Sequence, residues 1–289
     1  MPMHSNIQYM LMELLILSAA LSWSSPLILS GFVTCLAYGA AAVWGYVHPL
    51  GLLAVALSMS LAHLSGRYYR EPQSAVFHLA FICLGILLSV HLLPGFSNPV
   101  LIRPIQFTSD AYPFKMYLNL DKAAVGLSIF LLYEPLHKTS RISQSLLWAA
   151  IGTIAGTVAL VPPALITDVV VWAPKMPREF GLWALNNLFL VAFTEEALFR
   201  GFLQANLARV LHKFSASEWI ALGVASVAFG FLHYSGGPIM IVFASIAGAI
   251  YGTVYRHGGV LASTLAHFGF NVIHFLLFTY PLRLLTLPD

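Results

Sequence analysis

Charged side chains are scarce in this sequence. The 289 residues include 14 lysines and arginines and 11 aspartates and glutamates, which together make up 9% of the chain. Soluble domains usually carry about 25% charged residues, so a soluble fold is excluded. The formal net charge of +3 is too small to predict nucleic acid as a partner, and we expect none.

Cysteine is almost as rare. Cys35 and Cys83 each lie within an apolar run, and their spacing is neither that of a zinc site nor that of a redox motif. A single thiol in such a run usually packs as a small hydrophobic side chain. The chain also lacks an H-E-x-x-H motif and the alternating apolar pattern of a β-barrel. Its first apolar run has no basic segment before it and no small-residue cleavage site, so we expect a retained helix there.

Long apolar runs, by contrast, fill the sequence. Hydrophobic residues make up 59% of the chain, and runs of about 17–25 residues recur along it, the length that spans roughly 30 Å of hydrocarbon as a helix. The sequence therefore predicts an all-α fold, a polytopic transmembrane bundle of about 8–10 helices. We expect a multi-pass integral membrane protein surrounded by lipid, with the bacterial inner membrane as its location. The predicted helices cover residues 8–23, 26–47, 49–65, 75–94, 122–136, 144–166, 182–211, 217–234, 237–256 and 259–280, with long connections at 94–122 and 167–181.

Three charges stand close together inside one apolar run, 182–211. Glu195, Glu196 and Arg200 lie in the stretch Phe193–Gly201, although a charge in hydrocarbon costs roughly 2.5–3.5 kcal/mol on insertion scales. Glu196 and Arg200 are four residues apart, so on a helix they share a face and can form an ion pair. Glu195 points about 100° away from that face. It is therefore the unmatched acid of the cluster, and its partners are expected on other helices.

Two further motifs bring imidazoles into apolar helices. Phe229 and His233 are four residues apart near the end of one predicted helix, and His267 and Asn271 have the same spacing on the last helix. Taken singly, a histidine of this kind is usually a core or interface residue. A polar pair on one face usually forms a helix–helix hydrogen bond, worth about 0.6–2 kcal/mol. His274, on nearly the same face as His267, is a further candidate.

Taken together, these residue types form a working set for hydrolysis. A carboxylate and an imidazole can activate a water molecule between them. A second imidazole and an amide can stabilise the oxyanion that forms on an attacked carbonyl. Ala244, Gly248 and Gly252 form a ladder of small residues, which lets helices approach each other closely. The sequence therefore predicts a hydrolytic site built by three of the last four helices.

The order, spacing and types of the motif residues resemble one known family. This is the CAAX-protease and bacteriocin-processing (CPBP, or Abi) family of intramembrane proteases, related to the Ras-converting CAAX prenyl endopeptidases. The motifs that carry the resemblance are Glu195-Glu196-x-x-x-Arg200, Phe229-x-x-x-His233 and His267-x-x-x-Asn271. The resemblance predicts a protease core at residues 182–280, preceded by N-terminal helices of unassigned role at 1–181 and followed by a short tail at 281–289.

The resemblance implies a role for each motif residue. Glu195 would be the catalytic base, and His233 would help it to activate water. His267 and Asn271 would form the oxyanion site. The residues expected to support this constellation are Glu196, Arg200 and Phe229. The implied substrate is a membrane-associated peptide or protein: CAAX-processing members cut off a C-terminal tripeptide after a prenylated cysteine, and others act on different peptides.

A metal cofactor is an open question at this point. Glu195, His233 and His267 are two imidazoles and one carboxylate, a set that could hold zinc and leave one position open. A glutamate and a histidine can also activate water without an ion. We favour a reaction that requires no metal.

Two other functions stay open. A proton-coupled transporter would also place acids such as Glu13 and Glu134 in the membrane, although we find neither an inverted repeat nor paired broken helices. A non-proteolytic scaffold or immunity protein could have the same fold. Such a protein would have no need of buried charges, and the intact polar set argues against it.

Overall fold

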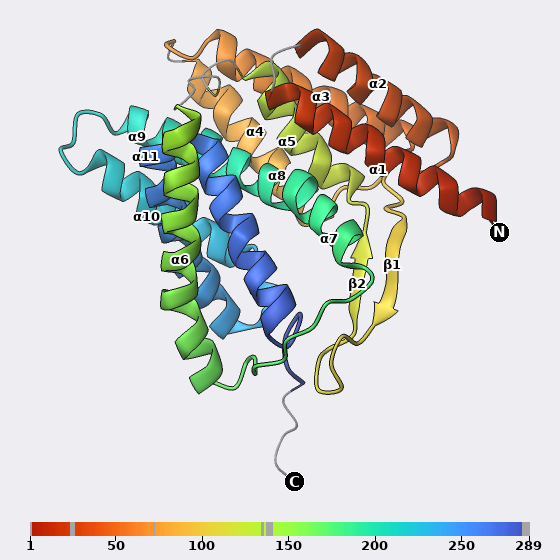
Figure 1. Cartoon of the computed structure of the whole chain (residues 1–289). Helices are drawn as coiled ribbons and strands as arrows, with labels where there is room; N and C mark the ends of the chain where they lie inside the picture. The colour runs from red at the N-terminus through yellow and green to blue at the C-terminus, as the bar shows by residue number, and fades with distance from the viewer. Residues whose placement is uncertain (1, 24–26, 72, 134–135, 137–140, 285–289) are drawn as a thin grey trace. The chain divides into compact units, whose positions relative to one another are not determined.

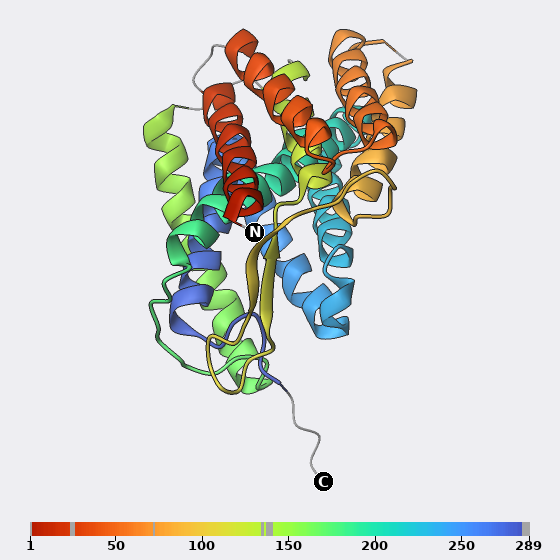
Figure 2. The same cartoon turned by 90° about the vertical axis from the view of Figure 1, so that its right-hand side faces the viewer.

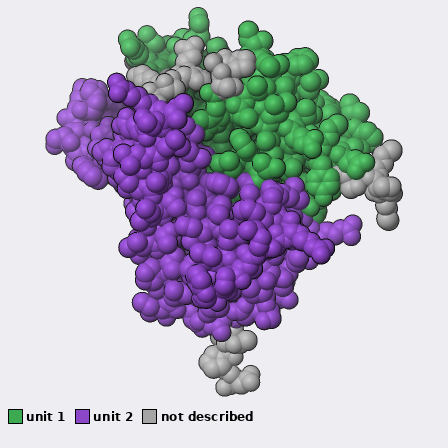
Figure 3. Space-filling model, in the orientation of Figure 1, with its two compact units in different colours: residues 1–101, 117–139, 185–203 green, residues 102–116, 140–184, 204–289 purple. Residues whose placement is uncertain are grey.

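The computed structural model describes residues 2–23, 27–71, 73–133, 136 and 141–284. These parts of the chain are mostly helical (Figure 1, Figure 2), which confirms the predicted all-α membrane bundle. The chain forms two compact units, coloured separately in Figure 3. Unit 1 comprises residues 1–101, 117–139 and 185–203, and unit 2 comprises residues 102–116, 140–184 and 204–289. Each unit is made of segments that alternate along the chain. The division predicted from the sequence, at residues 1–181, 182–280 and 281–289, is one of function and stays a prediction.

Unit 1 is built around helix α5, Leu120–Leu132. The helices that pack against it are α1 (Pro2–Trp23), α2 (Leu27–Val43), α3 (Pro49–Arg67) and α4 (Ser74–Ser89). Every residue of α5 from Leu120 to Leu131 is buried except Lys122. A helix that is buried on all sides is the centre of a bundle. The charged residues at its start, Asp121 and Lys122, therefore need partners within the protein.

Unit 2 is organised by helix α11, Pro238–Leu277, which packs against α6 (Ile142–Ile166) and α10 (Ser217–Phe231). The turn η4 (Tyr234–Gly236) joins α10 to α11. The small-residue ladder lies at this contact. A Cβ added to Gly248 would lie 3.0 Å from Cα of Ser226 on α10, so the two helices approach as closely as the ladder predicts.

Gly259 divides α11 into two antiparallel arms, residues 238–258 and 260–277. Its φ of 76° is non-helical, and glycine adopts positive φ at no steric cost. The rings of Tyr251 and His267 stack with their centroids 4.7 Å apart. On one straight helix the intervening residues would separate them by about 24 Å, at 1.5 Å per residue. The chain therefore reverses at Gly259, and α11 is the pair of helices predicted from the sequence.

The segment 180–210 is helical throughout, as predicted, but its turns are of different kinds. It begins with α7 (Phe180–Asn186) and ends with α9 (Ala205–Val210). Between them, the π-helical stretches η2 (Asn187–Ala192) and η3 (Ala197–Gln204) flank the four residues of α8, Phe193–Glu196. Wide π turns are rare and occur mostly at functional sites. Here they lie on either side of the two adjacent glutamates.

Within the described chain, α3, α6 and α11 are long and apolar enough to cross a membrane, and α2, α4 and α10 are shorter apolar helices. Helix α6 also leaves large apolar side chains exposed along its length: Ile142, Leu147, Ile154 and Val158. Such a face is expected to lie against lipid. The predicted number of spans stays a prediction.

The long connection predicted at 94–122 contains a β-hairpin, formed by β1 (Val100–Ile105) and β2 (Phe114–Tyr117). The sequence of β1 does not alternate: Leu101 and Ile102 are both buried, and the next two residues, Arg103 and Pro104, are both exposed. Because a strand is recognised by its alternation, this hairpin has a weak signal in the sequence.

Gly126 sets the distance between α5 and α8. A Cβ at this position would touch Thr194 Oγ1 and would lie 3.0 Å from Thr194 Cα, a backbone atom that cannot rotate away. We therefore expect Gly126→Ala to cost about 1–3 kcal/mol, seen as a lower midpoint of thermal unfolding in detergent. Gly39→Ala is the control, because no atom lies within 4 Å of a Cβ added there. An unchanged midpoint for Gly126→Ala would mean that α8 can move without cost.

Candidate functional site

Glu196 and Arg200 form the ion pair that their spacing predicts. Arg200 Nε lies 3.2 Å from Glu196 Oε2, and both side chains are completely buried. Two charges in such surroundings compensate each other's desolvation only while they stay together. The pair therefore holds the first turn of η3 to α8, the four-residue segment that also carries Glu195.

Glu195 has a partner that sequence reasoning missed. The ammonium Nζ of Lys122 donates to Oε1 of Glu195, and the two side chains are only 12% and 8% exposed. This partner lies on another helix, as expected, but on α5 and outside the three motifs. A signal was present in the sequence, because Asp121 and Lys122 are two charges at the start of an apolar run.

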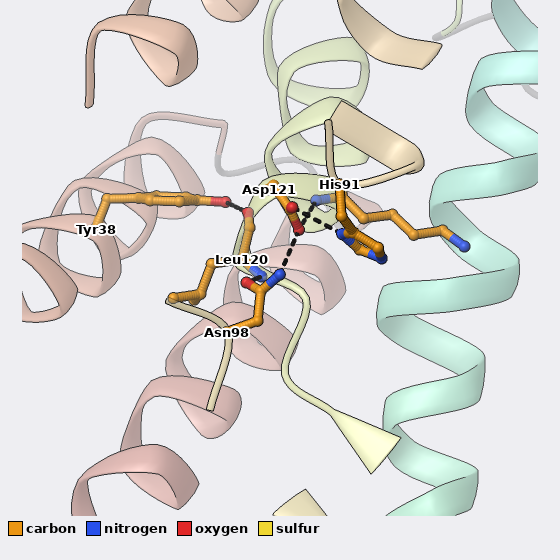
Figure 4. A network of polar contacts seen from close by, with 6 residues as sticks. Tyr38, His91, Asn98, Leu120 and Asp121 are labelled. Carbon is orange, nitrogen blue, oxygen red and sulfur yellow. Dashed lines mark hydrogen bonds and ion pairs between the residues drawn. The ribbon is translucent and has the colours of Figure 1, made fainter. Parts of the chain in front are cut away.

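Asp121 anchors the start of α5 (Figure 4). Its carboxylate accepts a hydrogen bond from Asn98 Nδ2 at 3.0 Å, and its Oδ2 lies 2.7 Å from His91 Nδ1. The backbone of Leu120 is also held: its N–H donates to Asn98 Oδ1 at 2.9 Å, and its carbonyl accepts from Tyr38 OH at 2.7 Å. These partners come from α2 and from the loop after α4. They satisfy polar groups that an isolated helix start would leave unpaired.

Two histidines meet at one phenylalanine in unit 2. The ring centroid of Phe229 lies 4.9 Å from that of His233 and 5.7 Å from that of His267. Tyr251 stacks on His267 at 4.7 Å, with 15° between the ring planes. Phe229 and Tyr251 are both buried. The aromatic rings thus bring the two imidazoles together from α10 and from the second arm of α11.

The contacts of His233 define its tautomer. The residue follows the end of α10, and its Nδ1 lies 3.0 Å from the backbone carbonyl oxygen of Phe229. A carbonyl oxygen only accepts hydrogen bonds, so Nδ1 carries the proton. When the ring is neutral, Nε2 is therefore its acceptor nitrogen.

The last helix carries two more candidates. Asn271 lies one turn beyond His267 on the second arm of α11, on the same face, as the spacing predicts. His274 is held at the end of this arm: its Nε2 lies 3.2 Å from the carbonyl oxygen of Thr279, and its ring meets Tyr280 edge-on. These contacts fix the His274 ring at the end of the arm, and its candidacy as a site residue stays a prediction.

The predicted site residues form two groups, each assembled within its own unit. The unit 1 group is Glu195, Glu196 and Arg200, with Lys122 as a partner that was not predicted, and the unit 2 group is Phe229, His233, His267 and Asn271. Each group has the chemistry that the sequence assigned to it. One offers a carboxylate in an apolar bundle, and the other offers imidazoles and an amide. The catalytic roles stay predictions, and so does the meeting of the two groups.

Among the donors suggested for zinc, Glu195 already has a cationic partner, and whether the set holds a metal stays a prediction. Lys122 already places a positive charge on Oε1 of Glu195, and a Zn²⁺ ion would have to displace it, because zinc binds the ionised carboxylate at about 2.0–2.2 Å. In the part of the chain that the structure describes, no group of three histidine, cysteine or acidic side chains is arranged to hold a metal ion.

Comparison with known proteins agrees with the motifs. Residues 177–273 match the model of the Rce1-like family, whose description is type II CAAX prenyl endopeptidase. The matched region contains every motif residue from Glu195 to Asn271. Neither the curated proteins nor the solved structures contain a significant match to the chain. Residues 177–273 are thus an Rce1-like domain, which supports the CAAX-protease (CPBP) family membership that the motifs predict, in a chain with helices long and apolar enough to cross a membrane.

Proposed function

We propose that the protein is an intramembrane endopeptidase that hydrolyses peptide bonds in membrane-associated peptides or proteins. The observation that carries the proposal is the pair of imidazoles, His233 and His267, on the buried ring of Phe229 within the Rce1-like region. Apolar side chains would fill these positions at lower cost in a membrane protein. We therefore infer that the imidazoles are present for chemistry.

Glu195 and His233 activate the attacking water in this proposal. The carboxylate of Glu195 takes a proton from the water while the water oxygen bonds to the carbonyl carbon of the scissile peptide. The acceptor nitrogen Nε2 of His233 orients the same water through a hydrogen bond. The carbonyl double bond opens, and its electron pair moves to the oxygen. The result is a tetrahedral intermediate with a negatively charged oxygen.

His267 and Asn271 are proposed to donate hydrogen bonds to that oxyanion. Donors fixed in place before the reaction stabilise the developing charge without reorganising. When the intermediate collapses, the C–N bond breaks and the proton held by Glu195 passes to the leaving nitrogen. The products are a carboxylic acid and an amine, and Glu195 returns to its ionised form. No metal takes part in any of these steps.

The test uses purified protein in detergent and two probes, a farnesylated peptide with a C-terminal CAAX sequence and the same peptide without the farnesyl group. Mass spectrometry follows release of the C-terminal tripeptide. His233→Ala is expected to lower kcat/KM by about 10²–10⁴-fold, the usual contribution of such a group. His212→Ala is the matched control, because the exposed His212 makes the same kind of contact, Nδ1 to the Arg209 carbonyl at 2.9 Å.

Three outcomes would count against parts of the proposal. Equal cleavage by folded His233→Ala and wild-type protein would overturn the assigned role of His233. Activity that disappears with a chelator and returns with zinc would overturn the metal-free mechanism. If neither probe is cut, protein termini are compared between cells with and without the active protein, and identical termini would overturn the peptidase proposal.

Fractionation of the same cells tests the bacterial inner membrane, which we propose as the location.

A further inference from the structure

Lys122 is a partly buried cation that contacts Glu195 within unit 1. It lies on α5, outside the Rce1-like region at residues 177–273, in the part of the chain to which the sequence assigned no role. Its ammonium donates to Glu195 Oε1, and only 12% of its side chain is exposed. Desolvating an ammonium group without a partner costs free energy, so the Lys122 side chain is expected to stay in contact with the Glu195 carboxylate.

The backbone at Lys122 is held by the preceding residue, Asp121, and its hydrogen-bond partners. Asp121 Oδ1 accepts a hydrogen bond from the backbone N–H of Lys122 at 2.9 Å. The same carboxylate contacts His91 and Asn98, and Asp121 itself is 2% exposed. A residue whose own backbone is tied in this way has less freedom to lose when its side chain forms a contact.

The opposite helix is fixed as well. Gly126 is four residues after Lys122, so both lie on the same face of α5. This face meets α8 at Thr194, the residue before Glu195, where only a glycine leaves room for the backbone. The distance between the two helices is therefore set one turn away from the ion pair.

From these contacts we propose that Lys122 is the positioning residue for Glu195. Its ammonium holds one carboxylate oxygen, which fixes the orientation of the whole group and offsets the cost of its charge in an apolar bundle. The α5 helix of the N-terminal region is then a part of the catalytic machinery. This inference rests on the proposed function, because the orientation of Glu195 matters for the reaction only if Glu195 is the base.

The first experiment separates positioning from substrate binding. Lys122→Met should lower kcat for the cleaved peptide probe by about 10²-fold, the loss typical of a reacting group misplaced by about 1 Å, and should leave KM unchanged. Lys122→Arg keeps the charge and should recover part of the loss. Lys213→Met, at an exposed position, is the control and should keep the wild-type kcat.

The outcomes distinguish this inference from the proposed function. If Glu195→Gln is inactive and folded Lys122→Met keeps the wild-type kcat, Lys122 is not a positioning residue and the proposed function stands. If Glu195→Gln keeps full activity, the proposed function fails first. A rise in KM with kcat unchanged would also contradict the inference, and so would an equal loss of kcat in Lys122→Met and Lys213→Met.

A second measurement needs no activity and covers the case in which Lys122→Met folds poorly. Thermal unfolding in detergent is followed for Lys122→Met, for Glu195→Gln and for the double variant. Lys122→Met leaves the Glu195 carboxylate without its cation, and Glu195→Gln leaves the Lys122 ammonium without its opposite charge. The double variant should therefore lower the midpoint by less than the sum of the two single changes. Additive losses would show that the two side chains are not coupled and would overturn the proposal.

Discussion

Substituting Glu195 with glutamine is expected to lower kcat/KM for the cleaved peptide probe by about 10²–10⁴-fold, the contribution usual for a general base. Glutamine has the shape of glutamate, but its amide cannot take a proton from water. Its carbonyl oxygen can still accept a hydrogen bond from Lys122 Nζ. The contact between α5 and α8 should persist, so the loss is one of chemistry and the protein should still fold.

The measurement compares cleavage rates of folded protein at matched concentration, with folding checked by size-exclusion chromatography. Glu218→Gln is the matched control: the side chain of Glu218 is 55% exposed and pairs with Arg256 at 3.4 Å, and neither residue belongs to the motifs. It should cleave the probe at the wild-type rate. The double variant Glu195→Gln/His233→Ala should be about as slow as the slower single variant, since both groups act on one water. Wild-type cleavage by Glu195→Gln would rule out Glu195 as the base.

Helical spacing predicted the local part of the site. Side chains four residues apart are neighbours on any helix, whatever the rest of the fold does. Glu196 with Arg200 and Phe229 with His233 were therefore predictable from the sequence, and the structure confirms both contacts. The transmembrane helices were predictable for a similar reason, because the length of an apolar run depends on the membrane and not on neighbouring helices.

Contacts between helices were not predictable in the same way. Lys122 and Glu195 meet across α5 and α8, and Tyr251 reaches His267 only because the chain reverses at Gly259. Such contacts depend on how each helix is rotated about its axis. In a soluble helix the polar face reveals that rotation. Helix α5 is buried on all sides, so its sequence has no polar face to read.

The π-helical turns beside Glu195 were missed for another reason. A π turn differs from an α turn by one residue per hydrogen-bonded ring, and no residue type marks that difference in an apolar run. Its effect is nevertheless local and specific, because η2 and η3 rotate the residues before and after α8 relative to a regular helix. The directions of side chains beyond α8 therefore cannot be derived from residue numbers alone.

Substituting Arg200 with methionine is expected to destabilise the fold by about 3–5 kcal/mol, because it leaves the carboxylate of Glu196 as an uncompensated buried charge. Both side chains are completely buried in the present pair. Methionine replaces most of the apolar stem of arginine, so the expected loss comes from charge and hydrogen bonding more than from a cavity. The measurement is the folded fraction in detergent as a function of temperature, by size-exclusion chromatography.

Two further variants decide what the pair does. Glu196→Gln/Arg200→Met removes both charges and should recover most of the stability lost by Arg200→Met, since no unpaired buried charge remains. Arg256→Met breaks the partly exposed pair with Glu218 and a contact with the Trp219 ring, and should cost no more than about 2 kcal/mol. If Arg200→Met cost as little as this control, the fold would not depend on the pair. The position of Glu196, one residue after Glu195, would then have to be explained by catalysis. In that case a stable Arg200→Met protein should lose cleavage activity.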